Sequence, residues 1–186
     1  MNPIPLLRGR FGRPFTFVEQ CASTQRLLDG AAEGAVAATD EQTEGRGRLG
    51  RTWQAPSGTS LLFSIVLLPQ VPPERLPELS LIAGRAVADA IAAETGLVPA
   101  LKHPNDVLLA GRKVAGVLAE ASEGRVVLGV GVNVTQKPGQ LPADVRTPPT
   151  SLLIETGRAI GRADLLLALL ERLERLYDEW LAGDGE

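Results

Sequence analysis

The sequence predicts one domain of the α+β class, spanning residues 1–186, with helices packed on one side of a mixed β-sheet. Strand-like stretches come in runs with a few helices between them, whereas a parallel α/β fold would alternate strictly. Two long stretches also carry apolar residues at helical spacing. The chain has 186 residues, 44% hydrophobic and 22% charged. That length and composition are typical of one soluble globular domain with a full core.

The N-terminal half contains three strand-like stretches after an irregular lead-in over residues 1–14. They are residues 15–19, 35–39 and the apolar run 59–68. Ser23 and Thr24 are expected to cap a short helix over residues 25–32, since hydroxyl side chains favour the N-cap position. The sheet is therefore expected to begin with three strands and one short helix.

The C-terminal half contains two longer helical patterns. Residues 76–95 place apolar side chains on one face and end at Gly96, and residues 164–181 repeat that pattern after a proline-rich loop. Three further strand-like stretches lie between them. They are residues 98–102, 113–121 and 125–134.

Residues 45–51 (GRGRLGR) form a cationic, glycine-rich segment in a chain of net charge −3. The glycines match G-x-G-x-x-G formally, but a dinucleotide site needs a helix after the last glycine and an acidic residue about 20 positions on. Residues 52–58 (TWQAPSG) cannot open a helix, and Gln70 stands at the acidic position. We expect an anion clamp instead, and a plain solvated loop is the alternative.

Three other segments have both a functional and a structural interpretation. Residues 102–106 (KHPND) are either a plain turn, with a packing role for His103, or a place where an amide and a carboxylate face a nucleotide. Lys113 is either a solvated charge or a cation at the mouth of a pocket. Gly129 and Gly131 allow close approach of a ligand or of a neighbouring helix. Cys21 is expected to be a structural thiol, because nothing nearby in the sequence would lower its pKa.

Composition also excludes several classes of protein. A mildly acidic chain argues against binding to nucleic acid or to an anionic membrane. One cysteine cannot form an internal disulfide, and no signal-peptide-like or membrane-spanning segment is present in the sequence. A cytoplasmic location is therefore expected.

In order along the chain, five segments resemble one family. They are residues 23–25 (STQ), Gln42 with residues 45–53, residues 102–106, residues 112–116 (RKVAG) and residues 131–133 (GVN). Over about residues 15–180 the chain closely resembles biotin protein ligases, or biotin–[acetyl-CoA-carboxylase] ligases. The resemblance implies a mixed-sheet catalytic domain akin to class II aminoacyl-tRNA synthetases and lipoate ligases.

The resemblance implies a two-step, ATP-dependent reaction. The biotin carboxylate attacks the α-phosphate of MgATP to give biotinyl-5′-AMP, and a lysine of the biotin carboxyl carrier protein then attacks that intermediate. By position, Lys113 would bridge the carboxylate and the α-phosphate, and Arg48 would close over the intermediate, so both are the implied catalytic residues. Asp106 is the implied metal ligand, for Mg²⁺.

The implied binding residues fall into two sets. The biotin set is Ser23, Thr24, Gln25, Gln42, Arg46, Gly47, Arg48, Lys113, Gly116 and Gly131. The nucleotide set is Arg48, Arg51, Trp53, Asn105, Asp106 and Asn133. The expected partners are biotin, ATP and the carrier protein, and a homodimer is compatible with the resemblance.

The chain departs from the family pattern at Gln25, where the family usually has Asn, and at His103, where it usually has Trp. Few residues follow the last predicted helix, so the family's C-terminal SH3-like domain is expected to be absent. No N-terminal DNA-binding domain, and hence no transcriptional role, is expected either. Two alternative functions remain, a lipoate or octanoyl transferase-like enzyme and a non-catalytic biotin-binding module. The GRGR loop beside the KHPND turn, with Lys113 and the loop arginines, argues against both.

Overall fold

One mixed, seven-stranded sheet organises the computed structural model, which describes residues 7–143 and 146–183. The strands are β1 (Phe15–Cys21), β2 (Val36–Gln42), β3 (Ser60–Leu67), β4 (Ala100–Lys102), β5 (Asp106–Leu109), β6 (Arg112–Ser122) and β7 (Arg125–Asn133). Their order across the sheet is β1-β2-β3-β7-β6-β5-β4. Only the β1–β2 pair among these strands is parallel. The predicted α+β class with a mixed sheet is thereby confirmed.

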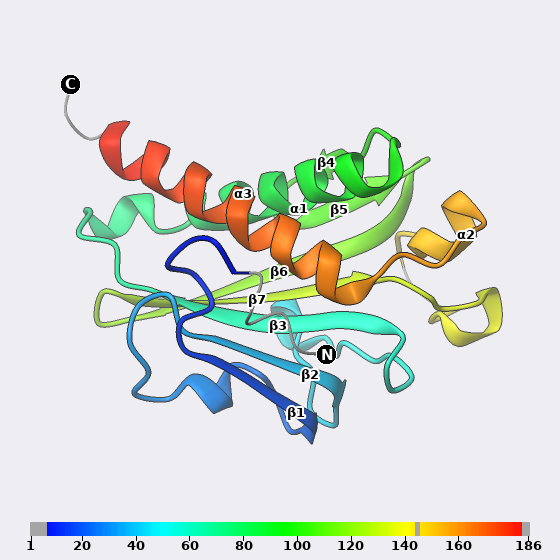
Figure 1. The fold of residues 1–186 in the computed structure, drawn as a ribbon, viewed down its shortest axis with the longest axis horizontal. Coiled ribbons are helices and arrows are strands. Elements are labelled where there is room, and N and C mark those ends of the chain that lie inside the picture. Colours follow the sequence, from blue (N-terminus) through cyan, green and yellow to red (C-terminus); the bar gives the residue numbers. More distant parts are fainter. Residues whose placement is uncertain (1–6, 144–145, 184–186) are drawn as a thin grey trace.

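Helices cover one face of this sheet. The helices are α1 (Glu78–Thr95), the short α2 (Leu152–Thr156) and α3 (Arg162–Ala182). Figure 1 shows α1 and α3 lying side by side against the sheet. The core lies between these two helices and the strands, with β3 buried along its whole length. A strand covered on both sides accounts for the continuous apolar run seen in the sequence.

Two predictions about local structure need correction, and two short elements were not predicted. The helix expected over residues 25–32 is only a single 3₁₀ turn, Arg26–Leu28, and no side chain caps it. The Thr24 hydroxyl, which was expected to cap the helix, bonds to Gln42 and Ser64. Tertiary contacts thus occupy this hydroxyl. β5 and α2 were missed, because each is too short to show a period.

Tyr177 anchors α3 to the region between β1 and β2. Its ring is fully buried, and its hydroxyl donates to Glu33 Oε1 at 2.9 Å. Burial, reinforced by the Glu33 carboxylate, raises the pKa of Tyr177 well above its usual range. The phenol therefore stays protonated in the folded state at a pH where an unfolded chain would ionise it.

We expect the free energy of unfolding to fall as the pH rises above about 10, the ordinary pKa of tyrosine. The folded pKa is raised, so the stabilisation is complete below that pH and is lost as the pH climbs towards the folded value. Tyr177→Phe should remove this dependence. Because Tyr177 is the single tyrosine, tyrosinate absorbance reports on it directly during denaturant titrations. Equal slopes of stability against pH in both proteins would contradict the assignment.

None of the helices in the described part of the chain is long and apolar enough to cross a membrane.

Candidate functional site

A cavity of about 490 Å³ lies against the strands β3, β6 and β7. Its volume is within the usual range for small-molecule sites. Every site residue predicted from the sequence lines it. These residues are Ser23, Thr24, Gln25, Gln42, Arg46, Gly47, Arg48, Arg51, Trp53, Asn105, Asp106, Lys113, Gly116, Gly131 and Asn133. The fold therefore brings together five segments that are far apart in the sequence.

Two glycines form the floor of the cavity. Gly116 and Gly131 are paired across β6 and β7, and the Trp53 indole lies on them. A Cβ atom on Gly131 would come 2.7 Å from Trp53 Cε2, and one on Gly116 would come 3.3 Å from Trp53 Cζ3. These glycines therefore let the Trp53 side chain, rather than a helix, approach the strands closely. The Trp53 Nε1 atom is buried and has no hydrogen-bond partner in the described structure.

Lys113 lies beside the floor and is paired with Asp106, with 2.6 Å between Nζ and Oδ1. Both side chains are largely buried, with 27% and 17% of their surfaces exposed. A bulge between Val107 and Leu108 shifts the β5–β6 register, and Asp106 pairs with Gly116. The shift brings the lysine and the carboxylate to one point, so the solvated-charge interpretation of Lys113 is wrong.

The KHPND turn is fixed to β6 by Asn105. Its Nδ2 atom donates to Val117 O at 2.8 Å, and its carbonyl accepts from Val117 N at 3.0 Å. These bonds place Asp106 where it meets Lys113. The expected packing role of His103 is wrong, because the side chain is exposed at the rim of the cavity.

A neutral polar wall stands at another side of the cavity. Ser23 and Thr24 are buried, and the Thr24 amide donates to Gln42 Oε1 at 2.8 Å. The Thr24 hydroxyl lies 2.7 Å from Ser64 Oγ. The wall offers donors and acceptors without net charge, as a neutral polar ligand group requires.

The base of the 45–51 loop is fixed. Trp53 N donates to Gly45 O, Gly47 N donates to Arg51 O, and a Cβ atom on Gly45 would come 2.4 Å from Trp53 O. Arg46 Nη2 lies 2.6 Å from Glu120 Oε2 and 3.2 Å from Gln25 Oε1.

The tip of this loop is free. Leu49 has a positive φ of 57° and is 87% exposed. Within the described residues, no hydrogen bond or ion pair involves the Arg48 or Arg51 side chain. These two cations are therefore available to a ligand.

Charge in the cavity is strongly one-sided. Six of its lining residues are cationic, and they are Arg46, Arg48, Arg51, Lys102, Lys113 and Arg146. Asp106 is the single carboxylate among the described lining residues. A concentration of positive charge in a cleft favours a polyanionic ligand. The described residues contain no cluster of three or more metal-ligating His, Cys, Asp or Glu side chains.

Asn133 and the loop after β7 complete the cavity. Asn133 Nδ2 donates to Thr150 O at 2.9 Å, which ties β7 to that loop. Lys102 Nζ donates to Thr147 Oγ1 at 2.7 Å. Arg146 and Thr147 also line the cavity and were not predicted, since the proline-rich loop holds no motif. Burial raises the pKa of the Cys21 thiol, which disfavours a nucleophilic role.

Residues 15–136 match the Biotin/lipoate A/B protein ligase family. The chain belongs to that family. Among curated relatives, it is 42% identical over 178 residues to the Biotin--[acetyl-CoA-carboxylase] ligase of Mycobacterium tuberculosis, covering 90% of this chain and 65% of that protein. It is 33% identical over 180 residues to the Bifunctional ligase/repressor BirA of Bacillus subtilis, covering 91% of this chain and 55% of the relative. The chain thus spans between about half and two thirds of the length of these two relatives.

Solved structures agree with this membership of the Biotin/lipoate A/B protein ligase family. The biotin protein ligase from Aquifex aeolicus in complex with biotin and ATP is similar with a TM-score of 0.81 and 34% identity. The match covers 89% of this chain and 71% of that one.

Proposed function

We propose that the protein is an ATP-dependent ligase that activates biotin as biotinyl-5′-AMP and transfers it to a lysine of a biotin carboxyl carrier protein. One observation carries this proposal most directly. The Lys113–Asp106 pair lies in a cavity where six cations face one carboxylate and where a neutral polar wall stands apart from that pair. A ligand with a neutral polar head would bind to the polar wall, and nucleotide phosphates would bind to the cations. The similar proteins are named as biotin ligases, which also supports the proposal.

In the first step, a biotin carboxylate oxygen forms a bond to the α-phosphorus of ATP. The bond from that phosphorus to the bridging oxygen breaks, and pyrophosphate leaves. Two anions must approach each other, so fixed cations supply the main stabilisation of the transition state. Lys113 would hold the two reacting groups together, and Arg48 and Arg51 would neutralise phosphate oxygens. Asp106 keeps the Lys113 ammonium in place before the substrates enter.

In the second step, the carrier lysine attacks the carbonyl carbon of the mixed anhydride. A C–N bond forms, the C–O bond to the phosphate breaks, AMP leaves with the electron pair, and the amine nitrogen gives up one proton to water. Neither step needs a nucleophile from the enzyme, which agrees with the raised pKa of Cys21. The protein's task is to bind, orient and exclude water.

Mg²⁺ would enter with the nucleotide. Magnesium is usually held by one or two carboxylates together with substrate phosphates, and Asp106 is a carboxylate of the required kind in the cavity. When bound, the ion would neutralise phosphate charge. A reaction that consumes ATP also favours a cytoplasmic location.

The matched family also includes lipoate ligases, so a lipoate-specific activity is the second candidate. The decisive experiment incubates the protein with MgATP, a carrier domain and either biotin or lipoate, followed by mass spectrometry of the carrier. Addition of one biotinyl group is the expected result. Lipoylation instead would favour the second candidate, and no mass gain with either acid would overturn the ligase proposal.

Arg48→Ala is expected to release biotinyl-AMP faster than the unmodified protein does. No hydrogen bond or ion pair within the described structure holds the Arg48 side chain, so the ligand itself must draw the loop tip inward. A hydrogen bond to a charged group contributes about 1.5–3 kcal/mol, and its loss corresponds to roughly tenfold faster release or more. Stopped-flow measurement of release tests this, with Arg85→Ala on the exposed face of α1 as the matched control. Equal release rates for Arg48→Ala and the control would leave the loop without a sealing role.

A further inference from the structure

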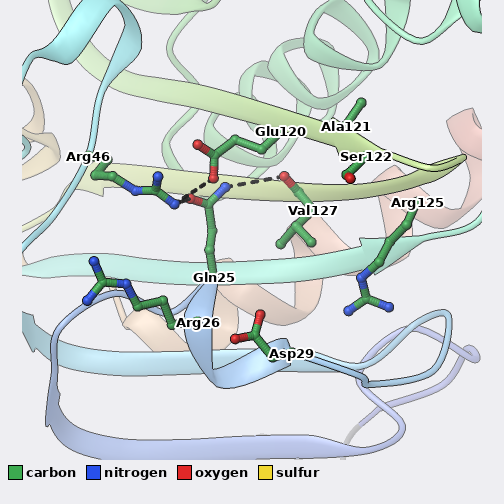
Figure 2. Close-up of a pocket in the computed structure, with 9 residues that line it drawn as sticks. All are labelled: Gln25, Arg26, Asp29, Arg46, Glu120, Ala121, Ser122, Arg125 and Val127. Atoms are coloured by element: carbon green, nitrogen blue, oxygen red, sulfur yellow. Dashed lines mark hydrogen bonds and ion pairs between the residues drawn. The ribbon is translucent and has the colours of Figure 1, made fainter.

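A second pocket, called the second compartment here, adjoins the cavity along the same two strands, and it has a volume of about 280 Å³. It is open to solvent, since Arg26, Asp29 and Ser122 in its lining are exposed. Figure 2 shows the residues that line it. The pairs Gly116–Gly131 and Leu118–Gly129 line the main cavity, and the next pairs, Glu120–Val127 and Ser122–Arg125, line the second compartment. These residues alternate with core positions, so they share one face of the sheet. Successive pairs are about 7 Å apart along the strands.

A polar partition separates the two compartments. Gln25 and Arg46 line both of them. Gln25 Nε2 donates to Val127 O at 3.3 Å, and its Oε1 accepts from Arg46 Nη2 at 3.2 Å. Arg46 Nη2 also lies 2.6 Å from Glu120 Oε2. Figure 2 marks these bonds with dashed lines among Arg46, Glu120, Gln25 and Val127.

Gln25 is the closing element of this partition. The residue is buried, with 7% of its surface exposed, and both ends of its side-chain amide are bonded. It lies over Gly129, where a Cβ atom would be 3.4 Å from Gln25 Nε2. The missing side chain at Gly129 leaves the room in which the amide crosses the ladder. Without Gln25, the floor would run on from Gly129 to Val127.

Most of the lining surface of the second compartment is apolar, and its charged lining residues are Arg26, Asp29, Arg46, Glu120 and Arg125. Arg26 is paired with Glu44, and Arg46 with Glu120. Arg125 donates to the carbonyls of Leu28 and Ala31, which leaves no carboxylate bonded to it. These partners satisfy the cations without an added anion. The compartment therefore suits an uncharged substituent of a ligand that is held in the main cavity.

We propose that Gln25 is the specificity-determining end wall of the substrate site, and that the second compartment is an extension subsite for a neutral substituent on the ring end of a biotin-like acid. The inference rests on the proposed function, which places the carboxylate of the acid at Lys113. From Lys113, the paired strands β6 and β7 continue past Gly129 to the partition. The ring system of the acid would therefore point towards Gln25. With glutamine in place, the site excludes acids that extend beyond the ring. A shorter side chain joins the two compartments.

The test measures binding by calorimetry in the intact chain, without ATP. The ligands are biotin and two biotin derivatives that carry a propyl group on one or the other ureido nitrogen. The proteins are the unmodified chain, Gln25→Ala, Gln25→Asn and Leu27→Ala. Leu27 follows Gln25 closely in the chain, is 39% exposed and lines neither compartment, so its substitution is the matched control.

We expect the ratio of derivative affinity to biotin affinity to rise about tenfold or more in Gln25→Ala for at least one derivative, a size typical of methylene-scale discrimination in a pocket. Gln25→Asn should give a smaller rise, and Leu27→Ala none. Biotin binding without any rise in either Gln25 variant would overturn the inference and leave the ligase proposal intact. A rise of equal size in Leu27→Ala would also overturn it, because a general loosening would then be the cause.

Failure of the unmodified chain to bind biotin would overturn the proposed function and this inference together. Gln25→Asn keeps the result decisive if Gln25→Ala does not fold, since it retains an amide at the same position.

Discussion

Lys113→Ala should abolish biotin-dependent exchange of pyrophosphate into ATP. The ammonium lies in a cavity that is lined by five other cations, and it is held 2.6 Å from Asp106, the single carboxylate among the described lining residues. Its removal takes away a fixed charge and leaves Asp106 facing two incoming anions. Loss of one preorganised donor to a developing charge lowers kcat by roughly 10²–10³-fold. We expect at least that loss here.

Lys137→Ala is the matched control for this prediction, because Lys137 is exposed and lies outside the cavity lining. Thermal unfolding of both variants separates chemistry from folding. Near-normal exchange by folded Lys113→Ala would refute the bridging role. A loss confined to KM would reduce Lys113 to a residue that binds ground state and transition state equally.

Gly131→Ala is expected to weaken biotin binding by about tenfold or more, since overpacking of a filled site costs roughly 1–3 kcal/mol. Its new methyl group would lie 2.7 Å from Trp53 Cε2, a distance that requires movement. The strand floor is fixed by pairing on both sides, so the indole must move towards the space of the ligand. Calorimetric titration with biotin measures the effect.

Gly139→Ala provides the comparison for Gly131→Ala, because a Cβ atom there has nothing within 4 Å. Unchanged biotin affinity in Gly131→Ala would show that the indole can give way without entering the site.

Strand-like apolar runs and apolar residues at helical spacing predicted most of the fold. β3, β6 and β7 lie where apolar runs were found, and α1 ends at Gly96, whose φ of 76° suits glycine. The helix predicted over residues 25–32 is too long, since only the 3₁₀ turn Arg26–Leu28 forms. Leu28 packs into a small second hydrophobic cluster, and the Thr24 hydroxyl bonds to Ser64. Tertiary contacts therefore override the local helix propensity there.

The membership of the site was predictable from its motifs, whereas its internal contacts were not. No sequence spacing indicates that the Trp53 ring lies on Gly131, since the two residues meet only through sheet pairing and a loop. Arg146 and Thr147 belong to a loop without a pattern, and Thr147 accepts a bond from Lys102, which also lines the cavity. The second compartment depends on the length of one side chain, Gln25.

The backbone of Lys113 has a consequence for how this chain tolerates changes in length. Lys113 N donates to Pro148 O and Lys113 O accepts from Thr150 N, each at 2.8 Å. One peptide segment thus positions both the Lys113 ammonium and the loop that completes the cavity beside it. A residue inserted in the adjoining turn at Ala110 and Gly111 would displace both at once. The turn at Glu123 and Gly124, at the opposite end of β6, adjoins the second compartment but not Lys113, so a residue inserted there would leave Lys113 and its loop in place.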